Sequence, residues 1–183
     1  NNKGNIQNLS FVFELSKCLN LSLKKIIKIT NKFKGLNYRQ QIIYNSKKLM
    51  MINDSKSTSL SATKPLLESF ENVYWILGGL SKKGDRLKLD RKYFKKIKAF
   101  IYGKDKYFFS KILERKIKYK ISNNINNSLY LIFEEILKKN NGKKVILFSP
   151  SAASFDQFKN FEDRGKYFNK ITNFYLKKYG VKK

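Results

Sequence analysis

The sequence predicts an α/β fold in which a Rossmann-like, mostly parallel sheet carries helices on both faces, preceded by a helical segment. From residue 41 onward, short apolar runs typical of buried strands alternate with longer segments of helical periodicity. Strands separated by helices of this length favour βαβ units, and therefore parallel pairing. Polar or glycine-rich residues follow several of the predicted strands, as at the ligand-binding edges of such folds.

Residues 1–35 are predicted to be helical. Apolar side chains recur at helical spacing across 6–19, and Ser22 is a suitable N-cap for a second helix that ends at Ile29. Gly35 is the expected breaker in the linker that follows. A helix pair of this size cannot bury its apolar face alone. We therefore expect this segment to be the C-terminal helical remnant of a larger domain.

Residues 36–183 are predicted to form a complete α/β domain. Its expected strands are 41–44, 48–52, 72–77, 98–102, 118–121 and 144–148, and its expected helices are 61–70, 90–97, 106–116, 127–140 and 161–179. Pro65 is tolerable only near the first turn of its helix. Asn126 or Asn127 is the expected cap of the helix over 127–140.

The composition excludes several classes of function. With no histidine and with Cys18 as the single cysteine, a His-based catalytic triad, a zinc site and an internal disulfide are not expected. The apolar runs are too short to span a bilayer, so no membrane insertion is expected. A lone cysteine fits a reducing compartment, and we expect a cytoplasmic protein.

The net charge is strongly positive, since 40 Lys and Arg residues against 13 Asp and Glu residues give +27. Such a charge is typical of nucleic-acid-binding proteins. Only five of the basic residues are arginine, however, and the lysines are spread along the chain. An A/T-biased genome would produce the same excess of Lys, Asn, Ile, Phe and Tyr. A basic nucleic-acid-binding α/β module is therefore kept as an alternative, and no nucleic-acid partner is expected.

Three segments carry polar groups that suit an anionic ligand. Residues 53–58, Asn-Asp-Ser-Lys-Ser-Thr, follow a predicted strand and offer a carboxylate, an ammonium and hydroxyls, although such residues also cap helices. Residues 78–85 begin with Gly-Gly and allow close backbone approach, as a flexible surface loop also would. Residues 148–165 provide Ser154 and spaced aromatic side chains, which would wall a pocket or belong to the core.

Together and in this order, these segments resemble the C-terminal part of the Mur ligases. The matching motifs are the linker Gly35 to Arg39, the block Asn53 to Thr58, the Gly78-Gly79 loop with Lys82 and, above all, Ser149 to Gly165. The resemblance runs to about Tyr179. Four positions depart from the family's pattern: Gly4 and Tyr38 replace histidines, Ser57 replaces an alanine and Ser59 replaces an asparagine.

The resemblance implies an ATP-dependent acid–amino-acid ligase. Its substrates would be D-glutamate, UDP-N-acetylmuramoyl-L-alanine and ATP, with an acyl-phosphate intermediate and with Mg²⁺ on the nucleotide phosphates. The D-N-P-R motif of members that add diamino acids is absent, which favours D-glutamate. Another Mur-type amide ligase is the alternative within the class.

The resemblance also assigns roles to single residues. Lys56 and Arg39 would be catalytic. D-glutamate would be contacted by Thr58, Lys82, Ser154, Phe155 and Phe161, and the nucleotide by Asn5, Asn8, Arg39 and Asp54. Arg164 would be a structural ion-pair partner at a helix start.

The family's P-loop, magnesium carboxylate and carbamylated lysine precede these motifs and are not found in this sequence. ATP and Mg²⁺ would therefore be bound mainly by a central domain outside this sequence, and no metal ligand is assigned here. The resemblance implies that this chain is one part of a longer, monomeric enzyme and is inactive alone.

Overall fold

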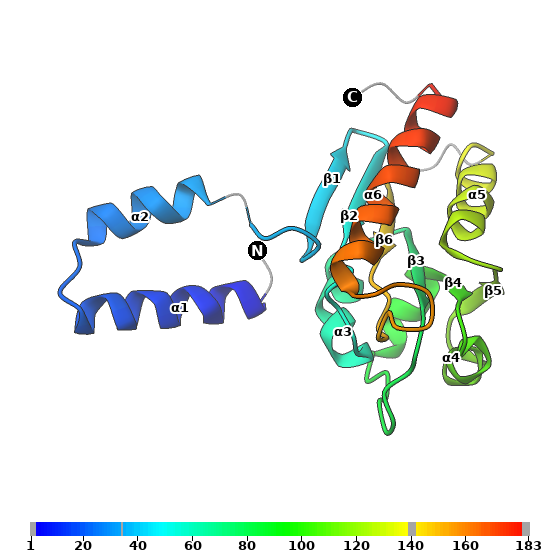
Figure 1. Cartoon of the computed structure of the whole chain (residues 1–183), viewed down its shortest axis with the longest axis horizontal. Helices are drawn as coiled ribbons and strands as arrows, with labels where there is room; N and C mark the ends of the chain where they lie inside the picture. Colours follow the sequence, from blue (N-terminus) through cyan, green and yellow to red (C-terminus); the bar gives the residue numbers. More distant parts are fainter. Residues whose placement is uncertain (1–2, 34, 139–141, 181–183) are drawn as a thin grey trace. The chain divides into compact units, whose positions relative to one another are not determined.

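The structure, a computed structural model, describes residues 3–33, 35–138 and 142–180 of the 183-residue chain. The chain divides into two compact units, Asn1–Leu36 and Asn37–Lys183 (Figure 1). Among the described residues, no helix is long and apolar enough to cross a membrane. Each unit is described by itself below.

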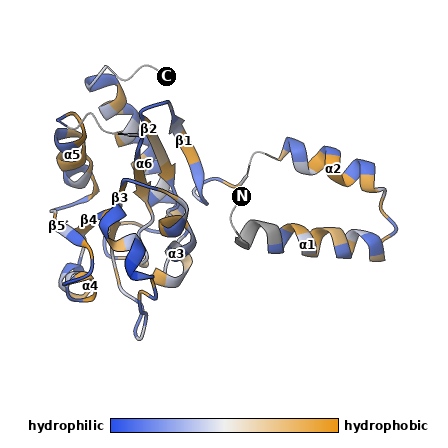
Figure 2. Ribbon diagram, turned by 180° about the vertical axis from the view of Figure 1, so that it is seen from behind, coloured by the Kyte–Doolittle hydropathy of each residue, from blue (hydrophilic) through white to orange (hydrophobic). Residues whose placement is uncertain are grey.

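The first unit consists of two helices, α1 (Lys3–Cys18) and α2 (Leu23–Lys32). Ser22 occupies the N-cap position of α2 as predicted, but its side chain makes no capping hydrogen bond. Apolar residues recur along both helices, as the orange segments of α1 and α2 in Figure 2 show, and many of their side chains are exposed. They include Phe11, Leu15, Ile29 and Phe33, each more than 60% exposed.

The second unit is built on a six-stranded sheet with the strand order β1-β2-β6-β3-β4-β5. The strands are β1 (Gln41–Asn45), β2 (Leu49–Asn53), β3 (Val73–Gly78), β4 (Ile97–Tyr102), β5 (Lys118–Ile121) and β6 (Lys144–Phe148). β1 and β2 form an antiparallel hairpin, and every other neighbouring pair is parallel. The predicted fold class, a Rossmann-like and mostly parallel sheet, is confirmed.

Helices cover both faces of this sheet (Figure 1). α3 (Leu60–Ser69) and α4 (Lys106–Leu113) pack on one face, and α5 (Ile125–Ile136) and α6 (Phe161–Lys178) pack on the other. Alternate residues of β3 supply the two cores: Trp75 faces α3 and α4, whereas Tyr74 faces α5 and α6. Strands buried on both faces explain the continuous apolar runs in the sequence.

Three predicted details of these helices were wrong. α5 begins at Ile125 and not at residue 127, because the side chain of Asn124 caps it by accepting from the amide of Asn127. Pro65 lies at the sixth position of α3, past the first turn. The burial of Leu66 and Leu67 outweighs the hydrogen bond that proline cannot donate.

The end of α4 and the type of another helix also differ from the sequence prediction. α4 ends at Leu113 and does not reach residue 116, since Arg115 adopts a left-handed conformation with φ +60°. The short helix expected over 90–97 is a 3₁₀ helix, η1 (Arg91–Lys96), capped by the Asp90 side chain. α5 ends at Ile136, short of the end predicted at residue 140, which itself lies outside the described residues.

Candidate functional site

The carboxyl ends of four parallel strands place the candidate segments at one edge of the sheet. The register pairs Asn53, the last residue of β2, with Phe148, the last residue of β6. Phe148 in turn pairs with Ile76 of β3, and Gly78 at the end of β3 pairs with Tyr102 at the end of β4. The loops that follow these strands therefore leave from the same edge, as expected for ligand-binding loops of such folds.

The loop after β2 is fixed by Asp54, which is buried. The amide of Gln40 donates to its Oδ1 at 3.0 Å, and the hydroxyl of Ser149 donates to its Oδ2 at 2.8 Å. Burial raises the pKa of Asp54 to about 6, while the hydrogen bonds from Ser149 and Gln40 and the charge of Arg39 oppose this shift. The carboxylate predicted to contact the nucleotide is thus engaged within the protein, with both oxygens hydrogen-bonded.

Exposed and buried side chains alternate along the same loop. Lys56 and Thr58 are exposed, whereas Ser55 and Ser57 beside them are buried. The Lys56 ammonium lies 3.9 Å from the centroid of the Phe161 ring at the start of α6. This cation–π contact brings together two predicted site residues that are more than 100 positions apart in the sequence.

Two glycines, Gly78 and Gly79, stand where β3 ends and the next loop begins, because the backbone leaves no room for a side chain there. A Cβ at Gly78 would lie 1.9 Å from the carbonyl oxygen of Tyr102, and one at Gly79 would lie 2.3 Å from that of Ala153. Their φ angles of +140° and +129° also disfavour any other residue. The glycines therefore let this loop pass directly beside the loop after β6.

Hydrogen bonds then hold the rest of this loop at three points. Leu80 pairs with Ala153 through two backbone hydrogen bonds of 3.0 and 2.9 Å. The amide and the hydroxyl of Ser81 both donate to Oδ2 of Asp105 at 2.7 Å, which lowers the pKa of that carboxyl. Oδ2 of Asp85 accepts from the amide of Leu60. Lys82 is exposed between these anchors.

Arg164 ties the loop after β6 to the loop after β2. Its guanidinium is 1% exposed and donates to the carbonyl of Ala152 at 3.0 Å and to the carbonyl and hydroxyl of Ser55 at 2.8 and 3.1 Å. These partners are neutral, so hydrogen bonds and not the predicted ion pair hold Arg164; the carboxylate of Asp156 acts on it through its charge alone. The role of Arg164 is structural, since it holds two of the candidate loops together.

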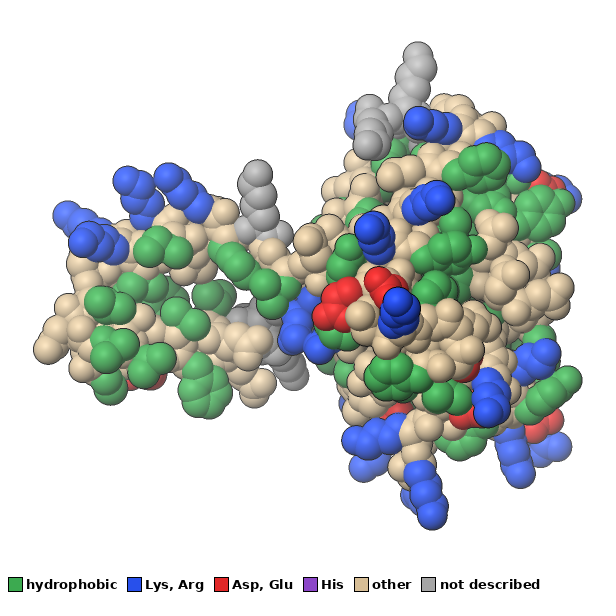
Figure 3. Space-filling view, viewed as in Figure 1, with side chains coloured by type: hydrophobic (Ala, Val, Ile, Leu, Met, Phe, Trp, Pro, Cys, Tyr) green, Lys and Arg blue, Asp and Glu red, His purple; other side chains and the backbone are tan. Residues whose placement is uncertain are grey.

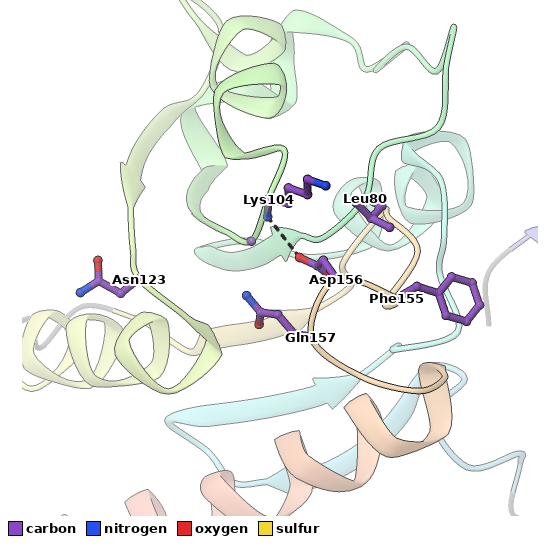
Figure 4. Close-up of a pocket in the computed structure, with 7 residues that line it drawn as sticks. Leu80, Lys104, Asn123, Phe155, Asp156 and Gln157 are labelled. Atoms are coloured by element: carbon purple, nitrogen blue, oxygen red, sulfur yellow. Dashed lines mark hydrogen bonds between the residues drawn. The ribbon is translucent and has the colours of Figure 1, made fainter.

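A pocket of about 540 Å³ opens beside these loops (Figure 4). Its lining comes from Leu80, Gly103, Lys104, Asn123, Phe155, Asp156 and Gln157. Oδ2 of Asp156 accepts from the amide of Lys104, which joins the loop after β6 to the loop after β4. The pocket is of the size that small-molecule ligands occupy.

Of the predicted site residues, only Phe155 lines this pocket, where its ring is 70% exposed. Ser154 is buried next to it, and its carbonyl accepts from the amides of Gln157 and Phe158. The other lining residues lie in the loops after β3, β4, β5 and β6, and none of them was predicted as a site residue. Their position directly after predicted strands is the signal that could have found them.

The predicted nucleotide-binding residues are divided between the two units. Arg39 is exposed near Asp54, where its charge opposes the rise in the pKa of that carboxyl. Asn5 and Asn8 lie on α1, in the first unit. Asn8 is exposed, and the side chain of Asn5 lies outside the described residues. In the part of the chain that the structure describes, no three His, Cys, Asp or Glu side chains form a group that could hold a metal ion.

The fold and these loops define an α/β domain with its candidate site at the carboxyl edge of a mostly parallel sheet, where the exposed side chains of Lys56, Thr58 and Lys82 lie on the loops after β2 and β3. Comparison with known proteins identifies which such domain it resembles. The chain is 36% identical over 165 residues to the UDP-N-acetylmuramoylalanine–D-glutamate ligase of Wolbachia pipientis wMel, covering 90% of this chain and 32% of that protein.

Two further relatives carry the same name. The protein of Rickettsia felis is 32% identical over 169 residues, which cover 92% of this chain and 37% of the relative. The protein of Mesorhizobium japonicum is 37% identical over 154 residues, which cover 84% and 33%. No protein-family model matches the chain.

These comparisons confirm the predicted resemblance. The chain is homologous to a C-terminal portion of the UDP-N-acetylmuramoylalanine–D-glutamate ligases, which are Mur ligases, and it spans about a third of the length of these relatives.

Proposed function

We propose that this chain is the amino-acid-binding C-terminal part of an ATP-dependent ligase that joins D-glutamate to UDP-N-acetylmuramoyl-L-alanine in peptidoglycan precursor synthesis. The observation that carries the proposal is the match to relatives with this name over some 90% of the chain. In the proposed reaction, ATP phosphorylates the muramoyl-alanine carboxylate. The amine of D-glutamate then attacks the acyl phosphate, an amide forms, and ADP and phosphate leave.

The chemistry of the candidate site supports this substrate class. A dicarboxylate such as D-glutamate needs cations, hydroxyl donors and free backbone amides at fixed positions. Exposed Lys56, Thr58 and Lys82 provide the first two kinds of group on loops that are anchored on both sides. We assign Lys82, Thr58 and Ser154, with the backbone at Phe155 and Phe161, to the two carboxylates of D-glutamate.

Lys56 is assigned to the reacting centre. Its ammonium lies over the Phe161 ring, and a cation held beside an apolar ring is well placed to stabilise negative charge that develops on an acyl phosphate. Arg39 and Asp54 are assigned to the nucleotide, together with Asn5 and Asn8 of α1. The described residues form no cluster that suits Mg²⁺, so no step is assigned to a metal here.

The exposed apolar side chains of α1 and α2 support a further part of the proposal. A two-helix unit that leaves Phe11, Leu15, Ile29 and Phe33 more than 60% exposed has too little core to be a domain of its own. We propose that residues 1–35 are the end of the ATP-binding central domain and that residues 36–183 are the amino-acid-binding domain. The whole enzyme is proposed to be a cytoplasmic monomer.

The test is an assay of D-glutamate-dependent phosphate release. The chain is joined behind the N-terminal and central domains of a Wolbachia or Rickettsia relative and is supplied with ATP, UDP-N-acetylmuramoyl-L-alanine and D-glutamate. Loss of one charge-assisted contact costs about 1.5–3 kcal/mol, so Lys82→Ala should raise the KM for D-glutamate roughly 10- to 150-fold. Ser154→Ala should raise it as well.

Lys83→Ala is the matched control, because Lys83 is an exposed neighbour of Lys82 to which no role is assigned. It should leave the KM unchanged. A folded fusion without D-glutamate-dependent release would reject the proposal. Release with a different amino acid would favour the alternative, another Mur-type amide ligase.

A further inference from the structure

A buried cluster of four hydroxyl groups lies directly beneath the loop that carries Lys56 and Thr58. Its members are Ser57 of that loop, Thr63 of α3, and Ser149 and Ser151 after β6. Each is 4% exposed or less. Oγ1 of Thr63 is the centre, at 2.8 Å from Oγ of Ser57, 2.7 Å from Oγ of Ser149 and 2.6 Å from Oγ of Ser151.

The number of hydroxyl protons decides which group is the donor in each hydrogen bond of this cluster. Each hydroxyl carries one proton, and that of Ser149 is donated to Oδ2 of Asp54. Thr63 must therefore be the donor in its contact with Ser149, and Ser57 the donor in its contact with Thr63. A chain of hydrogen bonds runs from Ser57 through Thr63 and Ser149 to the ionised carboxylate of Asp54, and each bond in such a chain strengthens the next.

The hydroxyl of Thr63 also contacts Ser151, which lies in a strained turn after β6. Ser151 has a φ of +57°, a left-handed conformation that is uncommon for a residue with a side chain. In this conformation its hydroxyl lies against Oγ1 of Thr63, to which it donates because the Thr63 proton goes to Ser149; the carbonyl of Ser149, at 3.3 Å, is a longer alternative acceptor for the same proton. Thr63 thus contacts both sides of the site, the loop after β2 and the turn after β6.

We propose that Thr63 is a positioning residue for the candidate site: its buried hydroxyl joins the loop after β2 to the turn after β6 and so fixes the directions in which Lys56 and Thr58 project. Ser57, which lies between these two residues, is the point where the cluster holds the loop. The importance of this position for catalysis rests on the function proposed above, whereas the contact itself does not.

The test replaces the hydroxyl without changing the volume of the side chain. Thr63→Val removes it, and Thr63→Ser retains it. Ser128→Ala is the matched control, because Ser128 belongs to a second buried hydroxyl pair, with Ser122, that is remote from these loops in the hydrogen-bond network. The full 183-residue chain is studied by NMR, with the backbone amides and the Asp54 carboxyl as reporters.

Thr63→Val should shift the NMR resonances of the backbone amides of Lys56, Ser57 and Thr58. It should also raise the pKa of Asp54, because Ser149 no longer accepts a hydrogen bond from Thr63 and therefore donates a weaker one to the carboxylate. Arg39 is the charged group that opposes this rise in both variants. Thr63→Ser should restore both signals, and Ser128→Ala should change neither. In the fusion enzyme, Thr63→Val should lower kcat/KM for D-glutamate on the order of tenfold, as misplaced catalytic groups do.

A folded Thr63→Val chain with unchanged Lys56–Thr58 amides and an unchanged Asp54 titration would overturn the inference, as would equal changes in Ser128→Ala. These readouts need no substrate. If they change as expected while the unmodified fusion shows no D-glutamate-dependent release, the proposed function fails and the structural contact stands.

Discussion

At the scale of single residues, the site depends on polar groups that are buried and fully used. Asp54 accepts two hydrogen bonds, and Arg164 donates three to neutral acceptors. An unpaired buried charge would be strongly destabilising. Both residues therefore act first on the shape of the loops, and the exposed residues between them are free to meet a ligand.

The raised pKa of Asp54 makes the stability of the second unit depend on pH. The folded chain holds this proton up to a pH of about 6, whereas the unfolded chain releases it near 3.8. The stabilisation is therefore complete below pH 3.8 and is lost as the pH rises through 6, an effect of up to about 3 kcal/mol.

We expect Asp54→Asn to gain stability relative to the unmodified chain between pH 4 and pH 7.5, because asparagine does not ionise. Urea unfolding of both chains at the two pH values measures this difference, and the other titrating groups cancel. A difference that is the same at both values would show that Asp54 is not buried as described.

At the scale of elements, the helix starts show which side chains act as caps. Asn124, Asn160 and Ser59 each accept an amide hydrogen bond within the first turn of their helix. Four asparagines lie within 123–127, so the sequence alone favoured the wrong ones for α5. The helix begins at Ile125 because this side chain is buried in the core, a fact that the local sequence does not reveal.

Asn124→Ala should therefore cost about 1 kcal/mol of unfolding free energy, the usual value for a lost N-cap. Asn126→Ala should cost little, since Asn126 is exposed and its side chain makes no cap. Thermal or urea unfolding of the two variants compares them directly. A larger loss for Asn126→Ala would place the start of α5 where the sequence predicted it.

At the scale of the whole molecule, both hydrophobic clusters belong to the second unit. The net charge of +27 is spread over the surface: blue lysine and arginine side chains are scattered over both units in the view of Figure 3. Scattered lysines are weaker support for a nucleic-acid interface than a single arginine-rich patch would be.

Because the described residues of these clusters, with those packed against them, begin at Ile43, a chain of residues 37–183 should fold without the two helices. We expect its thermal midpoint to lie within about 2–4 °C of that of the full chain, the shift that 1 kcal/mol produces in a domain of about 150 residues. Calorimetry of both chains measures it. A shortened chain that does not unfold cooperatively would show that residues 1–36 complete the core.

The sequence by itself determined the fold class, most of the strands and helices, the order of the three candidate loops and the family they resemble. These follow from local patterns, since apolar runs, glycine pairs and motif spacing are readable within a few residues. The tertiary structure alone decided that Asp54 is buried, that Arg164 binds the carbonyl of Ser55 and that the hydroxyl of Thr63 meets that of Ser149. The physical reason is that these contacts join residues 86 to 109 positions apart, and such partners meet only when the strands align at one edge of the sheet.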